Sequence, residues 1–212
     1  MNFLKVLLVS LIIITISGCA EKKPQVLKEF YAENIQEFIR KMQNYQSLES
    51  SLTIDYESKG SLLSGDAALK IYKNETLLRV YYMGFPVGEV YEKEGEFSSN
   101  LPMEKDKIIQ ILTGIKRGFM WWNGDFEVIE NEKNFILRER ESDREIVLTK
   151  NGFMPVSQTF TFENQKIFIV YEDFKEFQTH DNTTLIMPSQ IIVYYKNKNL
   201  KIRIEKLKLI NG

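Results

Sequence analysis

Residues 152–177 read GFMPVSQTFTFENQKIFIVYEDFKEF, and residues 185–209 read LIMPSQIIVYYKNKNLKIRIEKLKL. Apolar and polar side chains alternate along both stretches, which is the pattern of strands that bury one face. Asn151-Gly152 just before them is a strong signal for a tight hairpin turn. The alternation slips at Lys206, which predicts a β-bulge there. We predict strands at Pro155–Glu163, Lys166–Phe177, Leu185–Lys196 and Leu200–Leu209.

Shorter runs with the same period fill most of the chain before this stretch. They predict strands at Ser51–Tyr56, Ala68–Lys73, Thr76–Met83, Val87–Glu92, Glu96–Ser99, Phe126–Glu130, Phe135–Glu141 and Glu145–Thr149. Short turns join them, and no strand–helix–strand alternation appears, which argues against a parallel sheet. We therefore expect a single antiparallel meander of about eleven or twelve strands.

Two segments predict helices instead of strands. In residues 28–45 one apolar stripe recurs at spacings of four and three, as on an amphipathic helix. Its members are Tyr31, Ile35, Phe38, Met42 and Tyr45. Residues Glu104–Lys116 are apolar on more than one face, and Gly118 is expected to end this second helix. Because a sheet of this size curls and its concave face must be filled, we predict a mainly β fold, a strongly curved, unclosed half-barrel plugged by two helices.

The first residues resemble a bacterial lipoprotein signal peptide. Lys5 precedes an apolar run at Val6–Ile16, which would span about 16 Å as a helix against roughly 30 Å for the core of a bilayer. The run is therefore too short for a comfortable transmembrane helix. Ile16, Ser17, Gly18 and Cys19 follow it and resemble the lipobox that the lipoprotein signal peptidase recognises.

The lipobox resemblance implies cleavage before Cys19 and attachment of lipid to that residue, with palmitate an expected acyl chain. Cys19 is the only cysteine of the chain. Residues 1–18 would then be the signal peptide, residues 19–27 the lipidated cysteine and a tether, and residues 28–212 one folded domain. The alternative is an ordinary signal peptide with a chance cysteine. The lipidated protein would be held in the cell membrane with its domain outside the cytoplasm, or in the outer membrane of an organism that has one.

Composition narrows the class of protein. The chain has 212 residues, of which 43% are hydrophobic and 27% charged, and it carries a formal net charge of −1. This is typical of a globular domain rather than a disordered chain, and the lack of a basic surplus argues against a nucleic-acid partner. With one Cys and one His, neither a metal site nor a disulfide framework is expected.

No catalytic constellation is apparent. His180 is adjacent to Asp181 in a polar loop, where neighbouring side chains rarely face each other, so we interpret it as a solvated loop histidine. Residues 138–141 read Arg-Glu-Arg-Glu and predict cross-strand ion pairs on a wet face. An acid/base pair of carboxylates for glycan cleavage is the weaker alternative. We expect no catalytic residue, no cofactor and no metal, and predict that the protein is not an enzyme.

Apolar side chains at unexpected places are the candidate contacts for a hydrophobic ligand or a partner. Leu62 and Leu63 lie in one predicted turn and Phe85 in another, where each would be able to touch an acyl chain. The alternative is that these loops fold back on their own sheet. Trp121 and Trp122 follow the second helix and would line a cavity or anchor an interface. The alternative places one indole in the core and the other at the rim of the barrel.

Element order and local sequence resemble the LolA/LolB lipoprotein-carrier superfamily. Residues 45–56 (YQSLESSLTIDY) resemble its opening strand, residues 77–97 (LLRVYYMGFPVGEVYEKEGEF) its second and third hairpin strands, and residues 152–209 its closing hairpins. The resemblance implies a LolA/LolB-like fold. It also implies a non-enzymatic lipoprotein whose partner is the membrane, through Cys19.

Two functions remain open within this superfamily. Lys outnumbers Arg by 21 to 7 and Ile outnumbers Ala by 23 to 4, a bias typical of AT-rich genomes such as those of clostridia. The chain would then be similar to spore germination lipoproteins, which bind and regulate a cortex N-acetylmuramoyl-L-alanine amidase of the cell wall. The alternative is a LolB-like carrier or receptor that holds acyl chains between sheet and helices during lipoprotein sorting. The sequence leaves a homodimer open.

Overall fold

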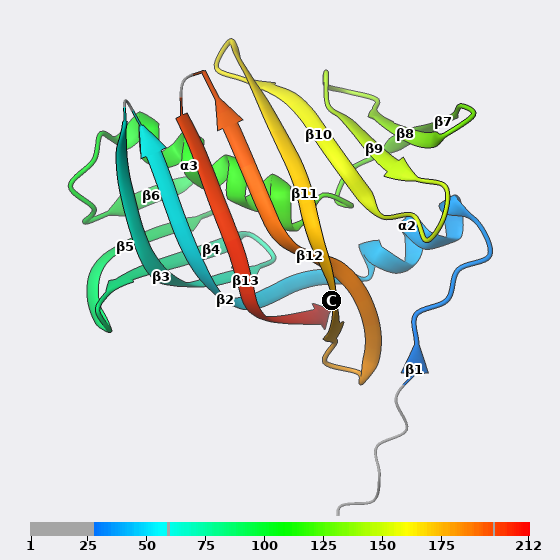
Figure 1. Cartoon of the computed structure of the whole chain (residues 1–212), viewed down its shortest axis with the longest axis horizontal. Coiled ribbons are helices and arrows are strands. Elements are labelled where there is room, and N and C mark those ends of the chain that lie inside the picture. The colour runs from blue at the N-terminus through cyan, green and yellow to red at the C-terminus, as the bar shows by residue number, and fades with distance from the viewer. Residues whose placement is uncertain (1–27, 59, 197) are drawn as a thin grey trace, which may run out of the picture.

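The computed structural model describes residues 28–58, 60–196 and 198–212. The predicted signal peptide (residues 1–18), the lipobox-like residues Ile16–Cys19 and the predicted tether up to residue 27 lie outside the described residues. The described chain forms thirteen strands and two helices (Figure 1). The helices are α2 (Ile35–Gln43) and α3 (Lys105–Phe119). The strands are β1 (Lys28–Glu29), β2 (Tyr45–Ser58), β3 (Ser61–Tyr72), β4 (Glu75–Tyr82), β5 (Phe85–Lys93), β6 (Glu96–Ser99), β7 (Phe126–Glu130), β8 (Asn134–Glu139), β9 (Glu145–Thr149), β10 (Pro155–Phe162), β11 (Gln165–Gln178), β12 (Thr183–Tyr195) and β13 (Lys198–Asn211).

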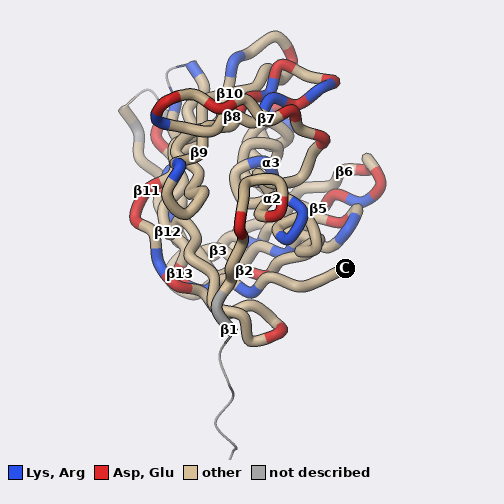
Figure 2. Tube along the Cα trace, turned by 90° about the vertical axis from the view of Figure 1, so that its right-hand side faces the viewer, with Lys and Arg blue, Asp and Glu red and all other residues tan. Residues whose placement is uncertain are grey.

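All strands belong to one sheet, in the order β6-β5-β4-β3-β2-β13-β12-β11-β10-β9-β8-β7, with β1 added beside β12. Every pair along this order is antiparallel, and β2 joins the first hairpins to the last strand through a long ladder with β13. Viewed along the molecule, the sheet curls around α3 without closing (Figure 2). The prediction of a mainly β, unclosed and curved antiparallel sheet with two helices is confirmed.

Helix α3 connects the two free edges of the sheet, β6 and β7, and packs on its concave face. Two glycines allow this close approach: a Cβ on Gly114 would lie 2.9 Å from Val193 Cγ1, and one on Gly118 would lie 3.2 Å from Ile191 Cγ2. Both are buried at the contact with β12. No helix of the described residues is long and apolar enough to cross a membrane.

The first helix is shorter than the stripe in residues 28–45 predicted. Asn34 begins it as the N-cap, and its Oδ1 accepts a hydrogen bond of 2.9 Å from the Glu37 amide. Before this cap the chain is extended, and Lys28 and Glu29 pair in parallel with Thr183 and Thr184 of β12. The helical periodicity of Tyr31 was therefore coincidental, and this side chain is 69% exposed.

The strand register agrees with the sequence at one irregular point and differs at another. The ladder between β13 and β2 shifts between Ile204 and Lys206, where the Ser50 hydroxyl donates to the Lys206 carbonyl at 2.8 Å, so the predicted bulge is confirmed. Leu62 and Leu63, however, lie within β3 and pair with Glu57 and Tyr56. The prediction of a turn at these leucines was wrong because β2 and β3 extend further than the alternation indicated.

Candidate functional site

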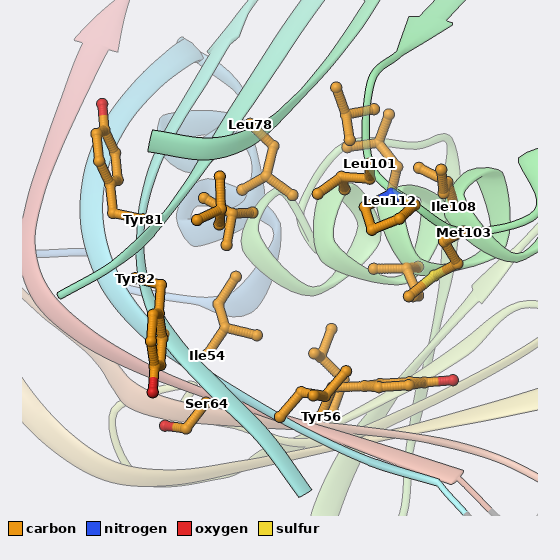
Figure 3. A pocket seen from close by; sticks show the side chains of 18 residues that line it. Ile54, Tyr56, Ser64, Leu78, Tyr81, Tyr82, Leu101, Met103, Ile108 and Leu112 are labelled. Carbon is orange, nitrogen blue, oxygen red and sulfur yellow. The ribbon is translucent and has the colours of Figure 1, made fainter. Parts of the chain in front are cut away.

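An apolar cavity of about 400 Å³ lies between the N-terminal half of α3 and the concave face of β2 to β5. Figure 3 shows side chains of β2, β4 and α3 meeting around this space. The residues that line it include no Asp, Glu, Lys, Arg or His, and its polar side chains are Ser64 and three tyrosines, Tyr56, Tyr81 and Tyr82. The arrangement can hold an apolar ligand and presents hydroxyl groups to it.

Each wall of the cavity follows from the period of its element. Alternate residues of a strand share one face, which places Ile54 and Tyr56 of β2, and Leu78 and Val80 of β4, on the cavity side. On α3, Ile108, Ile111 and Leu112 have the spacing of one helical face. The segment Leu101–Met103 before α3 closes the end. An apolar strand face and an apolar helix face thus oppose each other without filling the space between them.

The mouth of the cavity is itself apolar. Leu63, Tyr82 and Val87 line the cavity and yet are 62%, 56% and 49% exposed. Beside them the tip of the β4–β5 hairpin exposes Met83 at 80% and Phe85 at 74%. Such a cluster of exposed apolar side chains around an opening is typical of a site that meets a hydrophobic ligand or surface.

Of the predicted contact residues, the structure thus places Leu63 in the cavity and Phe85 next to it, since Phe85 pairs with Tyr82 across the hairpin. Leu62 is 65% exposed, but its side chain alternates with that of Leu63 and points to the other face of β3. We name Leu63, Tyr82, Met83, Phe85 and Val87 the apolar rim.

The tryptophan pair lies elsewhere. Trp121 and Trp122 are both fully buried, with ring centroids 5.6 Å apart at nearly a right angle, and neither lines the cavity. Trp122 Nε1 donates a hydrogen bond of 3.1 Å to the Tyr45 carbonyl, and Trp121 stacks on Phe38. The alternative that put one indole at the barrel rim was wrong, and buried rings offer no surface to a partner.

Arg144 is a buried charge that the sequence analysis missed. Its guanidinium is 2% exposed and donates to Gln158 Oε1 at 2.7 Å, to the Trp121 carbonyl at 2.7 Å and to the Asn123 carbonyl at 2.6 Å. It thereby satisfies the carbonyls that follow α3. Burial, reinforced by the positive charge of Arg117, lowers the pKa of Arg144 to about 10. Arg144 lies among other charged residues in the β8–β9 connection, and the sequence pattern does not indicate that its side chain, rather than a neighbouring one, is buried.

The predicted ion pairs of residues 138–141 form only in part. Arg138 pairs with Glu145 at 2.8 Å on the exposed face, as cross-strand pairing predicted. Glu139 instead turns inward, 3.4 Å from Arg144 and 3.3 Å from Arg117. His180 is exposed, and the carboxylate of Asp181 accepts from the Thr179 hydroxyl. Within the described part of the chain, no cluster of His, Cys, Asp and Glu has the arrangement of a metal site.

No protein-family model matches the chain, and no curated protein matches its sequence. Solved structures do share its architecture. A domain described as an outer membrane lipoprotein-sorting protein, from Vibrio parahaemolyticus, superimposes with a TM-score of 0.52 over 84% of this chain and 91% of its own, at 10% identity. A LolA superfamily protein from Nitrosomonas europaea gives the same TM-score and identity over 85% of this chain and 96% of its own. The fold is LolA-like. At this identity the likeness establishes the LolA-like fold and leaves the function to the site.

Proposed function

We propose that this protein is a non-enzymatic carrier or receptor that binds an acyl chain in the apolar cavity under α3. The observation that supports this most directly is the cavity itself, whose walls are mainly aliphatic and aromatic and include no Asp, Glu, Lys, Arg or His. The LolA-like fold supports it further, because one structure of this fold is described as a lipoprotein-sorting domain.

The volume sets the size of the ligand. A methylene group fills roughly the volume of a water molecule, about 30 Å³, so 400 Å³ accommodates about a dozen carbons of one chain. Burial at about 0.8 kcal/mol per methylene would contribute about 10 kcal/mol before the entropy of ordering is subtracted. One chain of medium length therefore fills the cavity, and the rest of a longer ligand would contact the apolar rim.

Anchoring completes the proposal. Lipidation at Cys19 would hold the domain outside the cytoplasmic membrane, and a second acyl chain would make the anchor stable. In cells grown with radioactively labelled palmitate, the wild-type protein should become labelled. The Cys19→Ser variant should remain unlabelled and be released from membranes. Equal labelling of both chains would contradict attachment at Cys19.

The binding test fills the cavity without touching the fold elsewhere. Val80→Trp places an indole in the space between β4 and α3, whereas Leu77→Trp adds the same ring on the other face of the same strand. Purified wild-type protein should bind a fluorescent fatty acid, Val80→Trp should lose at least tenfold in affinity, and Leu77→Trp should keep wild-type affinity. Equal affinity of the two variants would overturn the cavity as the site.

A second candidate function is the regulation of a cell-wall amidase. The back of the sheet, opposite the helices, exposes Phe168 at 40% and Tyr194 at 39%, stacked with their rings 6.1 Å apart. Exposed aromatic side chains of this kind are common anchors of protein interfaces. A tagged Cys19→Ser protein should then recover an amidase from sporulating cells, and Tyr194→Ser should abolish the recovery. Recovery that is the same for both chains, or absent, would exclude this surface as the docking site.

A further inference from the structure

A second, basic cleft of about 220 Å³ lies at the other end of α3. We name its four cations, Lys73, Lys116, Arg117 and Arg144, the basic cleft. Lys116 and Arg117 come from the last turn of α3, Lys73 from the turn after β3, and Arg144 from the β8–β9 connection. Three segments far apart in the sequence thus bring positive charge to one opening, in a chain whose formal net charge is −1.

The carboxylates at the cleft neutralise this charge incompletely. Lys116 pairs with Glu92 at 2.8 Å. Glu139 is shared between Arg117 at 3.3 Å and Arg144 at 3.4 Å, which is longer than the 2.7–2.9 Å usual for such charged bonds. Within the described residues, Lys73 joins no ion pair and lies over the ring of Tyr72. Four cations against two carboxylates leave an excess of about two positive charges.

The end of α3 does not account for this excess. A helix C-terminus attracts cations through its free carbonyls. Here the Arg117 carbonyl accepts from Gln158 Nε2 and the Lys116 carbonyl from the Met120 amide. Lys73 belongs to another element altogether. The buried side chains of Ile71 and Met120 also line the cleft, whereas Lys73 is exposed and the side chains of Lys116 and Arg117 are each 36% exposed.

We infer that the basic cleft binds an oxyanion of the phosphate class, either as a free ion or as the headgroup of a single-chain amphiphile. Arg117 supplies planar donors, and Lys73 and Lys116 supply mobile ammonium groups, which together match the several oxygens of a phosphate. Leu112, in the apolar cavity, precedes Lys116 by one helical turn, about 6 Å along the axis. The two pockets share no lining residue, so an amphiphile with its phosphate in the basic cleft would have to pass its chain along α3 to enter the cavity.

The test compares ligands that differ in the headgroup alone. Wild-type protein is titrated with lysophosphatidic acid, with the monoacylglycerol of the same chain, and with inorganic phosphate. We expect lysophosphatidic acid to bind about tenfold more tightly than monoacylglycerol, which corresponds to about 1.4 kcal/mol. Lys73→Gln/Lys116→Gln should abolish this difference and leave the monoacylglycerol affinity unchanged. Lys73→Gln alone, which removes no ion pair among the described residues, should reduce the tenfold preference for lysophosphatidic acid to about threefold.

The control variant is Lys70→Gln/Lys166→Gln, which removes the same charge from exposed positions outside the cleft. It should retain the preference for lysophosphatidic acid. Binding of inorganic phosphate without binding of either amphiphile would support the cleft as a site for the free ion and overturn the acyl-chain proposal. Equal affinity of wild-type protein for both amphiphiles, together with no binding of phosphate, would overturn the basic cleft and leave the acyl-chain proposal standing. If the control variant loses the preference for lysophosphatidic acid to the same extent as Lys73→Gln/Lys116→Gln, the basic cleft is likewise overturned as the site.

Discussion

Gln158 offers the sharpest test of how the end of α3 is held. Its side chain is fully buried, accepts from Arg144 Nε at 2.7 Å and donates to the Arg117 carbonyl at 3.2 Å. The substitution Gln158→Leu keeps a similar volume and removes both bonds. It leaves a buried guanidinium donor and a carbonyl without partners, each worth about 1–3 kcal/mol, and more for the charged group. We expect the free energy of unfolding to fall by about 4 kcal/mol.

This loss is measurable by thermal or urea unfolding. For a chain of this size 1 kcal/mol lowers the melting temperature by about 2–4 °C, so Gln158→Leu should melt about 8–16 °C below wild type. If the cost comes from the stranded charge, removing that charge should recover part of it. We therefore expect the loss in Gln158→Leu/Arg144→Met to be smaller than the sum of the two single losses, because Arg144→Met alone already leaves the Trp121 and Asn123 carbonyls without their donor.

Gln158→Glu is the conservative comparison, because its carboxylate still accepts from Arg144 and balances the charge. It should be more stable than Gln158→Leu. A loss below about 1 kcal/mol in Gln158→Leu, or a double variant whose loss is the sum of the single losses, would refute the argument from a stranded buried charge.

Two further predictions concern packing and acid stability. Gly114→Ala should lower the free energy of unfolding by about 1–2 kcal/mol, because crowding of the new Cβ against Val193 exceeds the gain in helix propensity. In a Val193→Ala background the same change should be neutral or stabilising. Thermal melts of wild type, the two single variants and the double variant check this, and an equal loss in both backgrounds would contradict it. Burial opposes ionisation of Glu139, but the Ser142 hydroxyl and the charges of Arg144 and Arg117 outweigh it and hold the pKa of Glu139 below 4.5. A carboxyl whose pKa is lower in the folded state contributes stability that is present above pH 4.5 and is lost as the pH falls through the folded-state pKa. The difference in free energy of unfolding between wild type and Glu139→Gln should therefore shrink from pH 7 to pH 3 in urea titrations. A difference that stays constant with pH would contradict this prediction.

The strands were predictable from the sequence because the alternation that marks them involves only residues that are close together in the chain. Alternation of apolar and polar residues reports which face of a strand is buried, and it located the long strands from Pro155 to Leu209 and the bulge at Lys206. The size of the meander was enough to predict curvature and plugging helices. The helix in residues 28–45 was overextended, since the cap at Asn34 competes with a periodicity that continues through Tyr31 by chance.

The candidate sites depended on distance in space rather than in sequence. Leu63 and Phe85 were noticed as misplaced apolar residues, but their meeting around a cavity arises from the pairing of β3, β4 and β5. Periodicity also could not tell that Trp121 and Trp122 are both buried, because burial there comes from α2 and β2, distant in the chain.

From its sequence alone, this protein was determined to be a curved antiparallel sheet with two helices, because hydrophobic period and turn residues act over a few neighbours. Only the tertiary structure decided where the interior stays empty and where charge collects. The cavity under α3 exists because the apolar face of the helix and the apolar face of the strands do not pack closely against each other. The basic cleft brings together Lys73, Lys116 and Arg144 from three segments of the chain. Both sites depend on contacts between residues far apart in the sequence, so no short stretch of the chain is enough to predict them.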